Sequence, residues 1–198
     1  MKASGGRAAT HIGDVTDAAA MEQMAALSVE RFGRLDYLIN NAAVRRERRF
    51  ADMTFQEWHE VTSVILDGAF LCAKACLAEL RCSGSGAIVN IGGLSAHTGS
   101  KDRAHVVTAK AGLVGFTRAL AHDLAADNIT VNCVVPGLIG TPRAPGAEPQ
   151  HHAIHRTLTG RRGAPDDVAA TVRFLCGPGA RFISGQTIHT NGGAYFSS

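Results

Sequence analysis

The sequence is poor in features that mark a disulfide-stabilised, metal-stabilised or membrane-spanning protein. It has five cysteines, an odd number, and none form a CxxC pair. We therefore expect neither a disulfide framework nor a zinc site, and interpret the cysteines as reduced apolar side chains of a cytoplasmic protein. The first residues have no apolar core, and no stretch reaches the roughly 18 apolar residues that a membrane span needs. We expect no export signal and no membrane association.

Net charge is also small. Lys plus Arg total 20 against 17 Asp plus Glu, a formal charge of +3. This excess is too small and too scattered to predict a nucleic-acid partner. The densest basic run, Arg45 to Arg49, has Glu47 in its middle. Two interpretations stay open for it: a solvated loop, or a contact surface for a partner or an anionic ligand.

Aromatic residues make up only 6% of the chain, whereas 45% of the residues are hydrophobic. This composition is typical of an Ala-, Val- and Gly-rich α/β protein rather than a disordered one. A chain of 198 residues is long enough to bury roughly 70% of its unfolded surface as one domain. We therefore expect a single domain over residues 1–198.

Strand-like and helix-like patterns alternate along the chain. Strands are expected at residues 8–15, 35–43, 86–91 and 129–135 and near the C-terminus, and the apolar run 35–43 predicts a strand covered on both faces. Helices are expected from Thr16-Asp17 to Gly33, from the capping box Thr54–Glu57 through Ala75, around Leu113 to Leu124, and after Pro165. Such alternation predicts a parallel, doubly wound sheet.

Five motifs, taken in order, resemble the short-chain dehydrogenase/reductase family, and in particular its 3-oxoacyl-carrier-protein reductases. They are Asp14-Val15, Asn40-Asn41-Ala42-Ala43, Lys110, the turn Pro136-Gly137-Leu138-Ile139-Gly140-Thr141 and the closing run SGQTIHTNGG. The resemblance implies a Rossmann-like fold and hydride transfer between NAD or NADP and an alcohol or carbonyl substrate. It implies that Asp14 and Val15 contact the adenine and that Lys110 holds the ribose. It places Asn40, Ala42, Pro136, Gly137, Ile139 and Thr141 in the same cofactor site.

The opening segment of that family has no counterpart in this sequence. Family members begin with a strand, a Gly-rich turn and a helix that holds the pyrophosphate, followed by a second strand and helix. This sequence starts about where the third strand does, and it contains no G-x-x-x-G-x-G. We therefore expect a sheet truncated at its N-terminal side. The apolar edge at 35–43 then needs a cover, either residues 8–15 or a second subunit.

The resemblance also assigns the catalytic positions residue by residue. The family's tyrosine position is Val106, its serine position is Gly93 and its asparagine position is Ile65, so only the lysine, Lys110, is retained. Valine, glycine and isoleucine side chains transfer no proton, and loss of a general acid lowers a rate by about 10²–10⁴-fold. Impaired chemistry is therefore expected.

Neighbouring residues offer substitutes for the lost groups. Ser95 and His97 lie two and four residues after Gly93, on the same side if the chain stays extended, so Ser95 joins Lys110 as a candidate catalytic residue. His105 adjoins Val106 but lies about 100° round the helix, and so faces elsewhere.

Several of these residues also have purely structural interpretations. Lys110 either binds a ribose or bonds nearby carbonyls at the sheet's edge, and Asp14 either contacts the adenine or caps the following helix. His151, His152 and His155 have a spacing that suits zinc, but no further ligand stands close by, so we interpret them as surface residues of a Pro-rich lid and expect no metal.

Three functions remain open from the sequence. The first is an oxidoreductase impaired in this form, and the second is a non-catalytic family member that acts in assembly or regulation. The third is a lyase step built on Ser95, His97 and Lys110 that needs no nicotinamide. The resemblance also implies a homodimer or homotetramer formed through the two long helices. These helices carry small residues that permit close approach: Gly68, Ala69, Ala73, Ala109 and Gly112.

Overall fold

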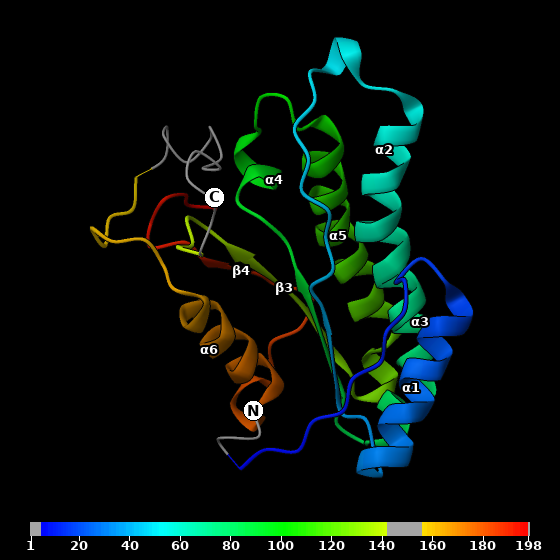
Figure 1. The fold of residues 1–198 in the computed structure, drawn as a ribbon. Coiled ribbons are helices and arrows are strands. Elements are labelled where there is room, and N and C mark those ends of the chain that lie inside the picture. Colours follow the sequence, from blue (N-terminus) through cyan, green and yellow to red (C-terminus); the bar gives the residue numbers. More distant parts are fainter. Residues whose placement is uncertain (1–4, 142–155, 198) are drawn as a thin grey trace.

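The computed structural model describes residues 5–141 and 156–197. Its centre is a parallel sheet with the strand order β1-β2-β3-β4 (Figure 1). The strands are β1 (Tyr37–Asn40), β2 (Ala87–Ile91), β3 (Thr130–Pro136) and β4 (Thr187–Thr190). Each neighbouring pair is parallel, and helices cover both faces of the sheet. The prediction of an α/β fold with a doubly wound, Rossmann-like parallel sheet is confirmed, and the four strands agree with the expected truncation.

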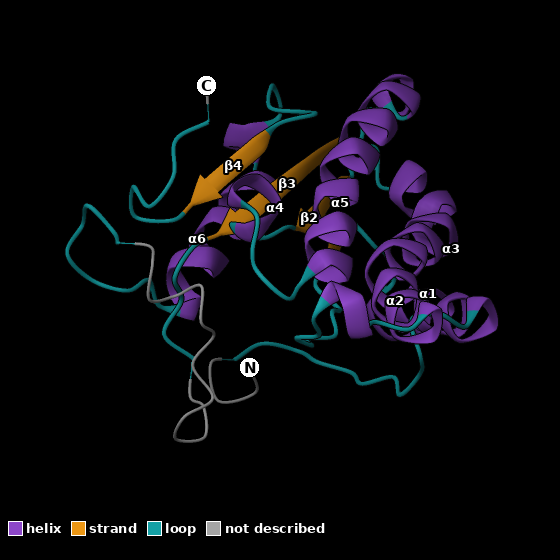
Figure 2. Cartoon of the chain, turned by 90° about the horizontal axis from the view of Figure 1, so that it is seen from above, coloured by secondary structure: helices purple, strands orange, loops and turns teal. Residues whose placement is uncertain are grey.

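The helices are distributed unequally between the two faces (Figure 2). On one face α3 (Gly68–Cys82) and α5 (Ala104–Asp123) lie against the sheet, with α1 (Ala18–Phe32) packed on α3 and α2 (Phe55–Thr62) packed on α5. On the other face lies α6 (Pro165–Cys176). The described residues also form short helical turns: η2 (Phe50–Asp52), η3 (Ser63–Asp67), α4 (Ser95–Thr98), η4 (Ala125–Asp127) and η6 (Pro178–Ala180).

The central strand β2 is buried on both of its faces. Ile88 belongs to the apolar cluster on the α3 side, together with Leu80 and Val131. Val89 belongs to the cluster on the α6 side, which includes Leu175. Because successive side chains of a strand point to opposite faces, a strand between two helical layers buries every side chain, and β2 is apolar except for Asn90.

The ends of the helices follow the capping signals in the sequence. The Asp17 carboxylate accepts hydrogen bonds from the backbone N–H groups of Ala19 and Ala20, and α1 ends at Gly33 with φ of 83°. Thr54 and Glu57 form the predicted capping box at the start of α2. The long helix expected after it is interrupted, because η3 inserts a π-helical turn between α2 and α3.

The prediction of a strand at residues 8–15 was wrong. The segment is irregular and forms no strand pairing, so that β1 pairs only with β2 within the described ranges. The local reason is a turn: the Asp14 carboxylate accepts hydrogen bonds from the N–H and the hydroxyl of Thr16, which competes with an extended backbone. Val15 then packs among the helices near Gly68 instead of along β1.

The expectation that the strand in 35–43 is covered on both faces was also wrong. Leu38 is buried under the helical layer, but Tyr37 and Ile39 are 48% and 41% exposed. They point to the face that α6 covers, and α6 contacts β2, β3 and β4 rather than β1. Pairing of residues 8–15 with β1 is therefore excluded in this structure, although His11 and Gly13 line a cavity beside β1. Cover by a second subunit stays a prediction.

By length and composition alone, the helical run Phe55–Cys82 could cross a membrane. The sequence analysis expected no such segment. Its apolar residues have another explanation in the fold, because Val61, Ile65, Cys76 and Leu80 are fully buried against α5 and the sheet. A core helix passes the same test of length and composition.

All five cysteines are free, as expected. Cys72, Cys76 and Cys133 are buried, and burial raises the pKa of the Cys76 thiol to about 12 and that of Cys133 to about 11. These thiols therefore act as small apolar side chains.

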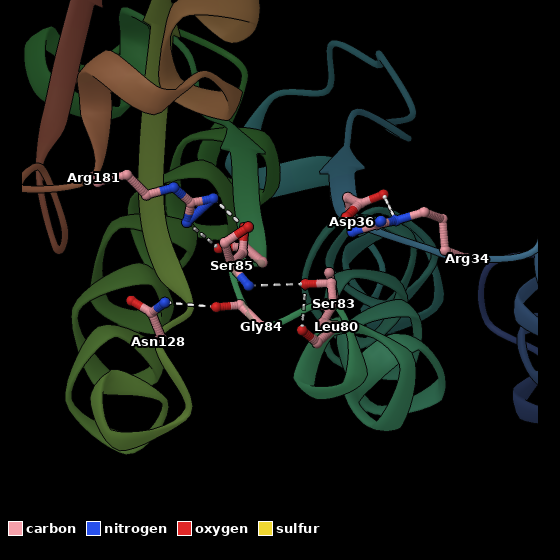
Figure 3. A network of polar contacts seen from close by, with 9 residues as sticks. Arg34, Asp36, Leu80, Ser83, Gly84, Ser85, Asn128 and Arg181 are labelled. Atoms are coloured by element: carbon pink, nitrogen blue, oxygen red, sulfur yellow. Dashed lines mark hydrogen bonds and ion pairs between the residues drawn. The ribbon is translucent and has the colours of Figure 1, made fainter.

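The turn that precedes β2 is held from two sides (Figure 3). The Asn128 amide donates a hydrogen bond to the Gly84 carbonyl at 2.6 Å. The Arg181 guanidinium donates to the carbonyls of Ser85 and Gly86. Asn128 precedes β3 and Arg181 precedes β4, so these contacts fix the start of β2 relative to the two following strands. They therefore help to set how the carboxyl ends of the strands align at the other edge of the sheet.

A buried chain of amide and hydroxyl groups joins β1, β2 and α5. The Asn40 side-chain amide donates to the side-chain oxygen Oδ1 of Asn90 at 2.8 Å, and the Asn90 side-chain amide donates to the Thr117 hydroxyl at 2.9 Å. That hydroxyl donates to the Leu113 carbonyl at 2.7 Å. Asn90 and Thr117 are fully buried, so water cannot replace a lost partner.

We predict that Asn90→Ala lowers the free energy of unfolding by about 2–4 kcal/mol, because it removes two buried hydrogen bonds and leaves the Asn40 amide with the weaker contact to the Ala69 carbonyl at 3.5 Å. Chemical denaturation measures the change. Asn41→Ala, at the exposed neighbour of Asn40, serves as the matched control and stays within about 0.5 kcal/mol of the native chain. An Asn90→Ala variant as stable as this control would contradict the prediction.

Candidate active site

A cavity of about 290 Å³ opens at the carboxyl ends of β2 and β3. Its wall combines the residues that follow β1, β2 and β3 with one face of the first turns of α5. The lining residues are Ala43, Val44, Arg45, Gly92, Gly93, Leu94, Ser95, Arg103, Val106, Lys110, Pro136, Gly137, Leu138 and Ile139. In open parallel sheets this edge is where ligands bind. We refer to this space as the main cavity.

Lys110 reaches the main cavity from α5 and is only 8% exposed. Its ammonium group donates a hydrogen bond to the carbonyl of Ile91, the last residue of β2. Burial lowers the pKa of Lys110 to about 8, because a low-dielectric surrounding disfavours the charged form. The structural interpretation of this lysine is thus confirmed as a contact, while its position also leaves it on the wall of the cavity.

The turn after β3 is fixed by close packing on the end of β4. The Gly137 N–H donates to the Thr190 carbonyl at 3.0 Å. A Cβ atom at Gly137 would lie 2.6 Å from the Cα and Cβ of Asn191, so the position admits glycine alone. Pro136, Gly137 and Ile139 consequently stand together on the wall of the main cavity, as predicted, whereas Thr141 is exposed and does not line it.

Val106 and Ile65 meet inside one apolar cluster. Val106, on α5, is 4% exposed and Ile65, in η3, is 1% exposed, and both pack with Val61 and Leu113. These are the positions at which the family resemblance expects tyrosine and asparagine. The cluster puts hydrocarbon next to the lysine where a proton relay would need oxygen and nitrogen atoms.

Gly93 leaves free space beside the lysine. A Cβ atom there would approach only the Lys110 Cγ, at 3.9 Å, which is ordinary van der Waals contact. Crowding therefore does not require a glycine at this position.

The two proposed substitute residues separate in space. Ser95 is buried, begins α4 and lines the main cavity with Lys110. His97 instead contacts His189 and Tyr195, at ring-centroid distances of 4.7 and 5.6 Å, and does not line the main cavity. The expectation that both stay on one side of an extended chain was wrong, because β2 ends at Ile91 and the chain coils into α4. His105, as expected, faces away, fully buried and outside the cavity.

Two arginines also line the main cavity. Arg45, which the sequence analysis singled out as part of the basic run Arg45 to Arg49, follows the end of β1. Arg103, which the sequence analysis missed, is the residue before α5 and is 6% exposed. Its spacing from Val106 was the available signal, because residues three apart on a helix share a face.

A second cavity, of about 220 Å³, gathers the other predicted cofactor residues. Val15, Asn40 and Ala42 line it together with Ile65 and Asn41. Asp14 is not part of its wall. Asp14 is not the helix cap either, because Asp17 takes that role and Asp14 only closes the preceding turn. The two cavities adjoin at Ala42 and Ala43.

The described residues fit one end of a nicotinamide dinucleotide. Lys110 and the Pro136–Ile139 turn suit the ribose and the nicotinamide. The second cavity contains Val15, which the family resemblance places beside the adenine. A diphosphate needs unengaged N–H groups at a helix start. At α1 these donors are taken by the Asp17 carboxylate, whose charge also repels phosphate. No Gly-rich turn leads into a helix within 5–141 or 156–197, so the diphosphate finds no fitting grip there.

His151, His152, His155 and the proline-rich segment from 142 lie outside the described residues. The interpretation of these histidines as surface residues of a lid, rather than as a zinc site, therefore stays a prediction from the sequence.

The buried ammonium of Lys110 makes stability depend on pH. Because its pKa falls from 10.5 to about 8 on folding, the unfolded chain binds more protons between these values, so this lysine makes the fold more stable as pH rises through them. We compare the free energy of unfolding of Lys110→Met with that of the native chain. We predict that this difference, variant minus native, falls by up to about 3 kcal/mol between pH 7 and pH 10.5, because the native chain becomes more stable over that range.

Denaturant unfolding of both chains across that pH range measures the difference. Lys74→Met, at an exposed position on α3, is the control and gives a difference that does not change with pH. If the difference in free energy of unfolding between Lys110→Met and the native chain also stays constant with pH, the lowered pKa of Lys110 is refuted.

Comparisons with known proteins agree with this arrangement. The family model described as Enoyl-(Acyl carrier protein) reductase matches residues 1–195. A 3-oxoacyl-[acyl-carrier-protein] reductase of Synechocystis sp. is 37% identical over 96% of this chain and 77% of its own length. The short-chain reductase protein NovJ of Streptomyces niveus is 36% identical over 98% of this chain and 77% of its own.

A solved structure shares the fold as well. It is a short-chain dehydrogenase/reductase of Brucella melitensis, titled a glucose/ribitol dehydrogenase, which superposes with a TM-score of 0.83 at 35% identity. The match covers 93% of this chain and 74% of that one.

Proposed function

The chain belongs to the short-chain dehydrogenase/reductase family, and from this premise we propose that it is an oxidoreductase whose alcohol and carbonyl chemistry is strongly impaired in this form. Its cofactor in this proposal is NAD or NADP, which supplies or accepts a hydride when bound. The proposal rests on one observation: around Lys110, the groups that would handle a proton are replaced by the hydrocarbon of Val106 and Ile65.

The site's retained parts support a ligand-binding role. Lys110 presents a cation at the carboxyl edge of the sheet, and the glycine-dependent turn at Gly137 shapes the opposite wall. These parts orient a ligand, but a carbonyl oxygen that gains a hydride also needs a proton. Val106 holds none to give, and Gly93 offers no hydroxyl to polarise the oxygen.

The size of the expected impairment follows from the missing groups. Loss of a positioned general acid alone removes about 10²–10⁴ in rate. The effects on rate of groups that act together are not additive. Once the general acid is lost, the further loss of the serine and the asparagine therefore lowers the rate by less than either loss would alone. Ser95 is the remaining hydroxyl on the cavity wall, and in this proposal it contacts the substrate oxygen.

The proposal predicts that Val106→Tyr combined with Gly93→Ser raises reduction of short ketones or oxo acids by about 10²-fold or more over the native chain. Gly93 has room for a side chain, and Val106 lies on the cavity wall into which a larger side chain would extend. NADH and NADPH oxidation by the purified proteins measures the rate, and a parallel titration of cofactor fluorescence measures binding.

Thr108→Tyr with Gly93→Ser is the matched control, since Thr108 lies on the same helix but is exposed, and it leaves the rate unchanged. Absence of cofactor binding at millimolar concentration refutes the oxidoreductase proposal for this chain. A native chain whose rate already equals that of the double variant refutes the impairment.

An assembly role is the second candidate, and exposed apolar residues on α3 and α5 favour it. Phe70 is 51% exposed and borders an apolar groove with Leu77, Phe116 and Leu120. The small residues expected at this interface are instead engaged within the chain: Ala69, Ala73 and Ala109 are buried, and Gly68 and Gly112 pack on Val15 and Leu66. We propose a homodimer or homotetramer formed through the groove beside Phe70.

This assembly predicts that Phe70→Glu weakens self-association by at least about tenfold, because a charge would enter an apolar interface. Sedimentation velocity over a concentration series measures the change. Phe50→Glu, at another exposed phenylalanine, is the control and leaves association intact. A native chain that sediments as a monomer, or a Phe70→Glu variant that associates as the native chain does, contradicts it.

A further inference from the structure

We infer that His97, His189 and Tyr195 form a pH-sensitive latch, which joins α4 to the C-terminal segment near neutral pH and opens on acidification. We call these three side chains the ring cluster, and residues 191–197 the C-terminal segment. The latch is a conformational device outside the main cavity. It depends on neither the oxidoreductase proposal nor the assembly proposal, because its contacts lie within one chain and involve no cofactor.

The ring cluster brings three separate parts of the chain together. His97 lies on α4, His189 on β4 and Tyr195 in the C-terminal segment. The ring centroids of His97 and His189 lie 4.7 Å apart in an edge-to-face arrangement. The Tyr195 ring lies 5.6 Å from His97 and 5.2 Å from His189. Rings at these separations attract each other, so the cluster holds the C-terminal segment to α4.

The cluster lies on the side of the sheet that carries α5. Thr190, the residue after His189, faces α6, because its hydroxyl lies 3.0 Å from the Thr171 hydroxyl on that helix. Successive side chains of a strand point to opposite faces, so His189 faces the layer that contains α5. Because α4 packs against α5, His97 meets His189 from the same layer.

The nitrogen atoms of the two histidines favour uncharged rings. His97 Nε2 and both ring nitrogens of His189 are buried, and within residues 5–141 and 156–197 none of them has a hydrogen-bond partner. A neutral imidazole has one N–H donor, whereas an imidazolium has two and carries a full charge. Burial of a charge without a partner is far more costly than burial of a neutral polar group. Protonation therefore destabilises the closed cluster.

The charges around the cluster also oppose protonation. Burial lowers the pKa of His97, and Arg118 of α5 lowers it further. Burial lowers the pKa of His189, and so does the neighbouring His97. Asp167 of α6 lines the same small cavity as His189, but both of its carboxylate oxygens accept hydrogen bonds from Arg161. This carboxylate is therefore already paired and does not offset a proton on either ring.

Two more ionisable groups lie on this side of the sheet. Cys133 of β3 pairs in register with Thr187, two residues before His189, and so shares the face of His189. Burial raises the pKa of the Cys133 thiol to about 11, so the thiol stays uncharged at acidic pH. Lys110 of α5 donates to the Ile91 carbonyl and is a cation. Neither group supplies a negative charge to the cluster.

The direction of the pH effect follows from the two histidines. Both have a pKa in the folded chain below the ordinary value of 6.5. As the pH falls below that value, an open cluster binds more protons than the closed one. The closed state therefore keeps its full stability above pH 6.5 and loses it as the solution becomes more acidic.

Opening of the cluster would loosen two other parts of the chain. The Gly192 carbonyl accepts hydrogen bonds from the N–H groups of Leu158 and Thr159, so the C-terminal segment holds the loop that these residues form. α4 is only four residues long and carries Ser95, which lines the main cavity. Acidification therefore acts on the loop at 158–159 and on the part of the cavity wall formed by Ser95.

Hydrogen-exchange mass spectrometry at pH 7.5 and pH 5.0 tests the latch, with rates corrected for the intrinsic effect of pH on exchange. For the native chain we expect the protection factors of residues 94–99 and 187–197 to be at least about fivefold lower at pH 5.0. The central strand β2 keeps its protection at both pH values, because the opening is local.

Two double variants remove the titration. His97→Phe with His189→Phe keeps the ring contacts but takes up no proton, so its protection factors in both segments agree within about twofold at the two pH values. His97→Gln with His189→Gln also takes up no proton, and it keeps the test decisive if the phenylalanine rings do not fit. His122→Phe, at an exposed position on α5, is the matched control and retains the native response to pH.

Three results would overturn the latch: native protection factors that do not change with pH in either segment, a loss in β2 as large as in these segments, or a loss that persists in both double variants. No cofactor, substrate or turnover enters these measurements. They are therefore independent of whether the double variant at Val106 and Gly93 gains activity.

Discussion

Two consecutive residues of β2 hold the helix on which the whole site depends. The Asn90 amide bonds to the Thr117 hydroxyl, and the carbonyl of the next residue, Ile91, accepts from the Lys110 ammonium. Lys110 and Thr117 are seven residues apart, two turns along the same face of α5. The helix is thus fixed to the centre of the sheet by two polar contacts inside an apolar interior, where unmade hydrogen bonds are costly. This attachment determines where Lys110, Val106 and Arg103 meet the cavity.

The polar anchoring of α5 contrasts with the hydrocarbon that replaces the proton-transfer groups. Ile65 and Val106 come from different helices and pack in one cluster, so an isolated polar atom at either position would face an apolar neighbour. The two replacements therefore support each other energetically. Gly93 differs from them, because nothing presses on it. The wall of the main cavity therefore combines this hydrocarbon with the hydroxyl of Ser95 and the ammonium of Lys110.

Local signals in the sequence predicted local structure well. The cap at Asp17, the glycine end at Gly33 and the capping box at Thr54 act over a few residues, and each appears in the fold. The strand expected at 86–91 is also present, as β2. Each of these inferences needs only the chemistry of neighbouring residues, and that chemistry is fully written in the sequence.

What the sequence did not predict depends in part on local turns and in part on contacts between distant segments. The turn at Asp14 and the contact of Val15 with Gly68 removed the strand expected at 8–15. The face of β1 stays open because α6 does not extend over it. Ser95 and His97 diverged when the chain coiled after Ile91. Arg45 and Arg103 are 58 positions apart by number and share a cavity only because the Arg48–Asp102 bond joins their loops.

The acidic cap of α1 has a consequence for how the molecule sorts anions. Nucleotide-binding folds usually concentrate positive potential at a helix start beside the sheet, and draw phosphate there. Here the N–H groups at the start of α1, which packs on α3, are occupied by the Asp17 carboxylate, while two arginines and Lys110 lie on the wall of the main cavity. Positive charge at this sheet edge is therefore carried by side chains and not by the start of α1.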